Sequence, residues 1–186
     1  MREWSTGVVV LSVGLAGLLV LLIAAMYNDR GSGGDTASTM VAEHVIDQIS
    51  AEPANSAIGL TITDCAGTVW NISTAPAALG AGTAANGGNG ANLTANAAFG
   101  EVIDWSQPYA GVPVGYKMLY LACGNNGRQE TYDVRWDMIT MSPYSRMVLI
   151  SARPAATPTV GTAAAQQGDL GLRFVNPVTL RTVNGM

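Results

Sequence analysis

Residues 7–26 read GVVVLSVGLAGLLVLLIAAM, a run of twenty residues without a charged side chain. Arg2 and Glu3 precede this run, and Asp29 and Arg30 follow it. A helix of this length is about 30 Å long, which matches the hydrocarbon core of a bilayer. The run therefore predicts a hydrophobic N-terminal helix that anchors the rest of the chain in a membrane.

A cleavable signal peptide explains the run less well. The apolar stretch is longer than the core of such a peptide, and Ala24-Ala25-Met26 is a poor cleavage site. A plain signal anchor that carries a domain remains an alternative.

The helical pattern changes after the apolar run. Residues 31–34 read GSGG, and glycine is a poor helix former, so we expect the helix to be interrupted there. A second, amphipathic stretch is predicted for residues 36–51, ending before Pro53. Its apolar stripe consists of residues four apart, namely Ala37, Val41, Val45 and Ile49.

Beyond Pro53 the apolar residues alternate with a period of two, which is typical of strands. Strands are predicted for residues 57–63, 67–73, 116–123, 130–141, 146–152 and 170–183. An Asn-Gly pair in the segment 124–127 favours a hairpin between the third and fourth of these. In the fourth strand, the buried face is expected to consist of Tyr132, Val134, Trp136 and Met138. The intervening Asp133, Arg135 and Asp137 are expected to face water.

Two segments are poor in residues that form a core. Residues 75–100 consist mainly of Ala, Gly, Asn and Thr, and residues 153–168 are rich in Pro, Ala and Thr. Both are expected to be surface loops. The predicted organisation is an N-terminal helix over residues 1–52 and an extracytoplasmic antiparallel β domain over residues 53–186, of the α+β class.

Composition excludes several functions. The net charge of −4, with one lysine, argues against a nucleic-acid partner. His44 is the one histidine, and we interpret it as a structural or surface residue. Asp133 and Asp137 are interpreted as a solvated strand face rather than an acid–base pair. We therefore expect no enzyme activity, no cofactor, no metal site and no small-molecule substrate.

The cysteine count predicts a crosslink. Cys65 and Cys123 are the two cysteines, and an even number in an exported chain favours a disulfide. Two buried free thiols are the alternative.

The order of these features resembles type IV pilins and pseudopilins, in particular minor pilins of the pilus-modification type. Glu3 precedes the apolar run and is followed by Leu11-Ser12-Val13-Gly14, a segment similar to one in that family. Residues 132–153 (YDVRWDMITMSPYSRMVLISAR) are similar to the closing hairpin of minor pilins. No basic leader ending in Gly is visible before Met1, so either the true start lies upstream or the helix inserts unprocessed.

The resemblance implies a structural subunit of a type IV pilus or a type II secretion pseudopilus. Such a subunit is held in the inner membrane before assembly and then lies in a cell-surface or periplasmic filament with copies of itself or other pilins. Glu3 is implied to pair with the N-terminal ammonium of a neighbouring subunit. The alternatives are a signal-anchored binding module that does not polymerise and, less well supported, an anchored hydrolase.

Overall fold

The computed structural model describes residues 2–54, 59–76, 88–98, 100–124, 127, 129–155 and 177–185. Within the N-terminal helix, the described side chains are those of residues 14–23, 25 and 35–50.

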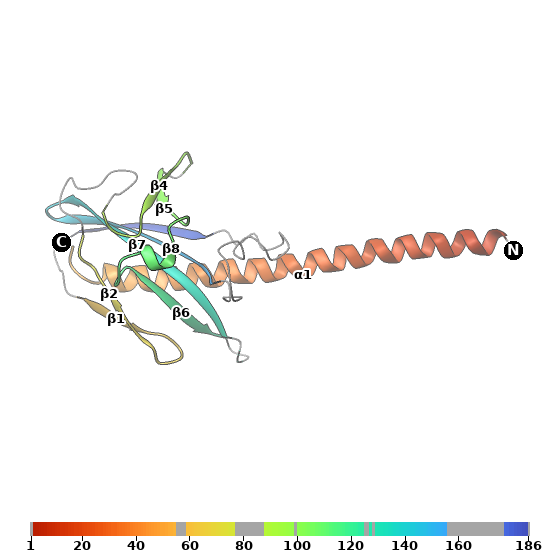
Figure 1. Cartoon of the computed structure of the whole chain (residues 1–186), viewed down its shortest axis with the longest axis horizontal. Helices are drawn as coiled ribbons and strands as arrows, with labels where there is room; N and C mark the ends of the chain where they lie inside the picture. Colours follow the sequence, from red (N-terminus) through yellow and green to blue (C-terminus); the bar gives the residue numbers. More distant parts are fainter. Residues whose placement is uncertain are drawn as a thin grey trace.

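The chain begins with one helix, α1 (Arg2–Ser50), which extends well beyond the β strands at its N-terminal end (Figure 1). The helix runs without a break through residues 31–34, so the predicted interruption is wrong. Three glycines cost about 3 kcal/mol in a helix interior, whereas ending a helix and nucleating a new one costs about 4 kcal/mol. The continuous helix is therefore the less costly arrangement.

The main sheet has five antiparallel strands. Its centre is the long hairpin of β7 (Gln129–Ser142) and β8 (Ser145–Pro154), with β9 (Val178–Gly185) on the far side of β8. Two strands share the other edge of β7: β6 (Lys117–Cys123) pairs with its first half and β3 (Asn89–Gly90) with its second half. The predicted hairpin around the Asn-Gly pair is confirmed in this sheet. The C-terminal strand predicted for residues 170–183 is confirmed from Val178 on, and residues 170–176 lie outside the described ones.

Two small hairpins flank the main sheet. One consists of β1 (Leu60–Thr63) and β2 (Val69–Ile72), as predicted. The other consists of β4 (Leu93–Asn96) and β5 (Gly100–Ile103), followed by a short 3-10 helix, η1 (Tyr109–Gly111). Because β3 and β4 lie within residues 75–100, the prediction that this whole segment is an irregular loop is wrong.

The hydrophobic core lies between the C-terminal half of α1 and one face of the main sheet. The helix buries Val41, Val45 and Ile49, as the predicted stripe requires. The sheet buries Tyr132, Val134, Trp136 and Met138 from β7, and Val148, Ile150 and Ala152 from β8. Burying each aliphatic side chain contributes about 1.5–3 kcal/mol, so this contact fixes the helix on the sheet.

Two polar side chains bind the C-terminal end of α1 to the sheet. Arg146 on β8 donates hydrogen bonds to the carbonyl oxygens of Ile49 and Glu52, both at 3.0 Å. Asn184 on β9 donates to the carbonyl oxygens of Ser50 and Glu52. The last carbonyl groups of a helix have no partner in a following turn of the helix, and a cation there also interacts favourably with the helix dipole.

No helix built from the described residues is both long enough and apolar enough to cross a membrane. The predicted transmembrane helix and the predicted inner-membrane location are therefore corrected.

The predicted fold class needs the same correction. A long hydrophobic helix, interrupted near residues 31–34 and of pilin type, is not what the described residues support. They support a mostly antiparallel β domain that follows an uninterrupted α1.

Candidate functional site

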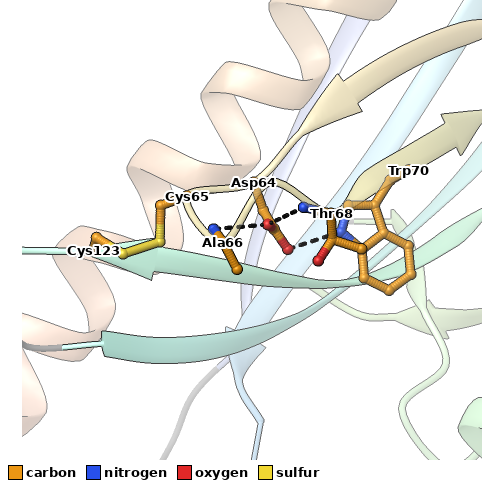
Figure 2. The surroundings of a disulfide bond; sticks show 6 residues. All are labelled: Asp64, Cys65, Ala66, Thr68, Trp70 and Cys123. Atoms are coloured by element: carbon orange, nitrogen blue, oxygen red, sulfur yellow. Dashed lines mark hydrogen bonds between the residues drawn. A yellow bond between two sulfur atoms is a disulfide. The ribbon is translucent and has the colours of Figure 1, made fainter.

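The predicted site residues lie in separate places. Glu3 falls within the bounds of α1, but its side chain is outside the described ones. Cys65 and Cys123 are joined by a disulfide, with their Cα atoms 6.0 Å apart, which excludes two free thiols. The disulfide attaches the turn of the β1–β2 hairpin to the end of β6 (Figure 2).

The turn beside the disulfide is ordered by one carboxylate. Oδ1 of Asp64 accepts hydrogen bonds from the backbone N–H groups of Ala66 and Thr68, and Oδ2 accepts one from the Trp70 indole at 3.1 Å (Figure 2). Burial opposes ionisation of Asp64, but these hydrogen bonds together hold its pKa below the usual value. Asp64 therefore fixes the geometry of the turn.

His44 lies on the exposed side of α1, with its ring centroid 6.3 Å from that of Tyr120. This placement agrees with its interpretation as a surface residue. In the part of the chain that the structure describes, no three metal-ligating side chains lie together.

The first candidate functional feature is the apolar stretch of α1. The N-terminal part of α1, which carries this stretch, extends beyond the β strands (Figure 1). Six side chains of the stretch are 59–67% exposed: Leu15, Leu18, Leu19, Val20, Leu21 and Leu22. A contiguous apolar surface of this kind on a folded protein marks a place where another molecule binds.

The second candidate feature is a charged face of β7, which the sequence placed in water. Asp133, Arg135 and Asp137 are only 6%, 2% and 1% exposed, so that prediction is wrong. The segment from β3 to η1 covers this face, and β7 is therefore buried on both sides. The alternation of charged and apolar residues could not reveal this, because the covering segment is itself poor in apolar residues.

An ion pair lies at the centre of this face. The guanidinium of Arg135 binds the carboxylate of Asp133 through both Nε and Nη2, with Nη2 2.7 Å from Oδ2. Nη1 of Arg135 donates to the carbonyl oxygen of Gln107 in the covering segment at 2.6 Å. Arg135 thus attaches the covering segment to the sheet.

Cations and aromatic rings alternate around Arg135. Its Cζ lies 4.5 Å from the Trp105 ring centroid, and the Cζ of Arg153 lies 4.2 Å from the same ring. Lys117 Nζ lies 4.6 Å from the ring centroid of Tyr109 and donates to the Tyr109 carbonyl oxygen. Each contact of this kind contributes about 0.5–2 kcal/mol.

Burial perturbs the pKa values of this cluster. Desolvation raises the pKa of Tyr109 to about 12, with a further contribution from the charge of Asp133 that Arg135 opposes. Desolvation lowers the pKa of Arg153, which the nearby Asp133 opposes. Tyr109 therefore remains neutral at physiological pH, and the contacts of the cluster bind the covering segment to the sheet.

Asp137 lies next to this cluster, where β3 meets β7. Its backbone faces Gly90 of β3, and its carboxylate contacts Gly88 so closely that an added Cβ at Gly88 would overlap Oδ1. Oδ1 is buried and accepts no hydrogen bond from the described residues. Desolvation, together with the charge of Glu101 on β5, raises the pKa of Asp137 to about 8.

Reasoning from the sequence missed this cluster. One signal was available: Trp105 and Tyr109 lie close together just after a segment of small residues. Aromatic rings near a strand that carries Asp133, Arg135 and Asp137 indicate a partner for those charges rather than a solvated face.

Comparison of the chain with models of protein families, with curated proteins and with solved structures finds no match.

Proposed function

We propose that the protein is a structural subunit of a filament of the type IV pilus or type II secretion pseudopilus class. It assembles through the N-terminal part of α1. The observation that carries this proposal is the exposed apolar stretch over residues 14–23, which projects from the β domain (Figure 1). The similarity of Glu3 and Leu11-Ser12-Val13-Gly14 to the pilin pattern supports the same class.

The exposed side chains surround the helix rather than forming one stripe. Leu18, Leu19, Val20, Leu21 and Leu22 are consecutive, and successive helical residues are rotated by about 100°. One partner helix covers only a stripe of about that width. Covering all five residues therefore requires several neighbouring helices, as in the core of a filament, rather than one partner in a dimer.

The free energy available from this burial is large. Each of the five exposed leucines and the one valine contributes about 1.5–3 kcal/mol when it is buried, or about 9–18 kcal/mol together. Association opposes this gain through lost translational and rotational freedom, at an estimated cost of about 4–15 kcal/mol. Repeated contacts with several copies are the arrangement that exceeds this cost.

The proposal is tested by assembly of the purified full-length protein after dilution out of detergent. Leu19→Lys places a charge within the apolar stretch, whereas the control Val114→Lys changes an exposed side chain of the β domain. We expect wild type and Val114→Lys to form filaments that sediment and are visible by electron microscopy. Leu19→Lys should remain in the supernatant with the same thermal unfolding midpoint.

Two results would contradict the proposal. One is sedimentation of Leu19→Lys to the same extent as wild type. The other is a wild-type protein that stays monomeric under every assembly condition, which favours a binding module that does not polymerise.

A further inference from the structure

We infer that Asp137 and Gly88 form a pH-sensitive latch, which holds the covering segment on β7 when the Asp137 carboxyl is neutral and releases it when the carboxyl is ionised. The covering segment here means residues 88–112, apart from residue 99. This inference does not depend on the proposed filament.

The attachment of the covering segment at this point is short. Among the described residues, β3 pairs with β7 through Asn89 with Met138 and Gly90 with Asp137. One further backbone hydrogen bond, from Ala91 N–H to the Trp136 carbonyl oxygen at 2.9 Å, continues the contact. The Asn89 side chain also donates to the carbonyl oxygens of Ala75 and Pro76, so opening at Gly88–Gly90 breaks this limited set of hydrogen bonds.

The Asp137 carboxyl lies directly against this attachment. At Gly88 an added Cβ would overlap Asp137 Oδ1 and would lie 2.6 Å from the Met138 carbonyl oxygen. The Gly88 backbone thus closes the space around the carboxyl, and Oδ1 has no hydrogen-bond donor among the described residues. A neutral carboxyl is tolerated in such a place, but a carboxylate without a donor is strongly destabilising.

The charged groups around Asp137 do not offset its ionisation. Glu101 on β5 carries the same charge and raises the pKa of Asp137. Arg135, two residues away on the same face of β7, binds Asp133. Arg181 on β9 lies in the same row of the sheet, with Leu149 of β8 between, and its Nη2 donates to the Glu101 carbonyl oxygen.

Contact with water is then the remaining way to stabilise an ionised Asp137. Because Gly88 contacts Oδ1 and Asp137 is 1% exposed, water hydrates Oδ1 when the Gly88–Gly90 segment moves away from the edge of β7. That movement loosens the first part of the covering segment. The cation and aromatic contacts of Trp105 still bind its last part to the sheet.

Hydrogen exchange of the full-length protein in detergent tests the latch, with rates corrected for the intrinsic effect of pH. We expect peptides from residues 88–98 to be equally protected in wild type and Asp137→Asn at pH 4. The pKa of Asp137 is about 8 in the closed segment and returns toward 3.8 when opening exposes the carboxyl to water. The protection of wild type relative to Asp137→Asn should therefore fall by about tenfold for each pH unit above pH 4 and level off near pH 8. The control Asp47→Asn, at an exposed position on α1, should behave as wild type.

Equal protection of wild type and Asp137→Asn at pH 9 would overturn the inference. A second variant keeps the test decisive if Asp137→Asn does not fold. Glu101→Gln removes the neighbouring charge and should move the opening midpoint to lower pH; an unchanged midpoint contradicts the latch. Restored protection in millimolar calcium at pH 9 would also contradict it, because the carboxylate would then be a metal ligand.

Discussion

Arg146 on β8 donates a hydrogen bond from Nη2 to the carbonyl oxygen of Ile49, in the last turn of α1, at 3.0 Å. The two residues are 97 positions apart in the chain. Arg146 is 1% exposed, and its Nη1 also donates to the Thr74 carbonyl oxygen. One buried guanidinium therefore connects the helix, the main sheet and the segment after β2.

We expect Arg146→Met to destabilise the protein by about 3 kcal/mol, because the carbonyl oxygens of Thr74, Ile49 and Glu52 each lose a charged hydrogen-bond donor. The size of the side chain is nearly retained, so the loss reports hydrogen bonding rather than a cavity. Chemical denaturation of the full-length protein in detergent measures the change. Arg146→Lys, which keeps the charge but has fewer donors, should lie between wild type and Arg146→Met; equal stability of all three proteins would contradict this role.

Gly88 is a position where only glycine fits. Its φ is +90°, and a Cβ there would overlap the Asp137 carboxylate. Gly88→Ala should therefore cost about 3 kcal/mol or more, combining backbone strain with the steric conflict. Gly127→Ala is the matched control, since φ is +70° there and the space for a Cβ is open. The control should cost about 1 kcal/mol, and equal losses in the two variants would show that the close contact at Gly88 is unimportant.

Asp137 makes stability depend on pH in a defined direction. Its pKa is about 8 in the folded protein and 3.8 in the unfolded reference, so the folded protein retains a proton that the unfolded chain has lost. The stabilisation is fully present below about pH 4 and is lost as the pH rises to about 8. Thermal unfolding of wild type should show this decline relative to Asp137→Asn. Parallel curves for the two proteins between pH 4 and pH 8 would contradict it.

The disulfide closes a loop of 58 residues and should stabilise the protein by about 4 kcal/mol in the chain-entropy model. We expect the Cys65→Ala/Cys123→Ala double variant to show this loss in chemical denaturation. Wild type measured with reductant should show the same loss. A difference below about 1 kcal/mol would mean that Asp64 and its hydrogen bonds alone hold the turn.

Local patterns predicted the individual elements well. The four-residue spacing of Val41, Val45 and Ile49 identified the docked face of α1, and the Asn-Gly pair identified the β6–β7 hairpin. These signals succeed because neighbouring residues determine which side of an element is buried. The same reasoning placed an interruption at residues 31–34, where cooperativity along the helix outweighs the propensity of single residues.

Long-range contacts were beyond such patterns. The burial of Asp133 and Asp137 depends on a segment of small residues that lies on the sheet because Trp105 and Arg135 attach it there. The contact of Arg146 with the end of α1 likewise joins residues that no local spacing relates. The sequence pattern also predicted an apolar helix that spans a membrane, whereas no described helix is long and apolar enough to do so.

The most direct test of the filament proposal is site-specific photo-crosslinking in assembled particles of the full-length protein. A benzophenone amino acid replaces Leu18, which is 66% exposed on α1, or Val114 as the control. We expect a ladder of crosslinked subunits from position 18, with crosslinks that map to residues 14–23 of neighbouring copies. Position 114 should give no crosslinks to residues 14–23. Particles in which position 18 gives no crosslink between subunits would contradict assembly through α1.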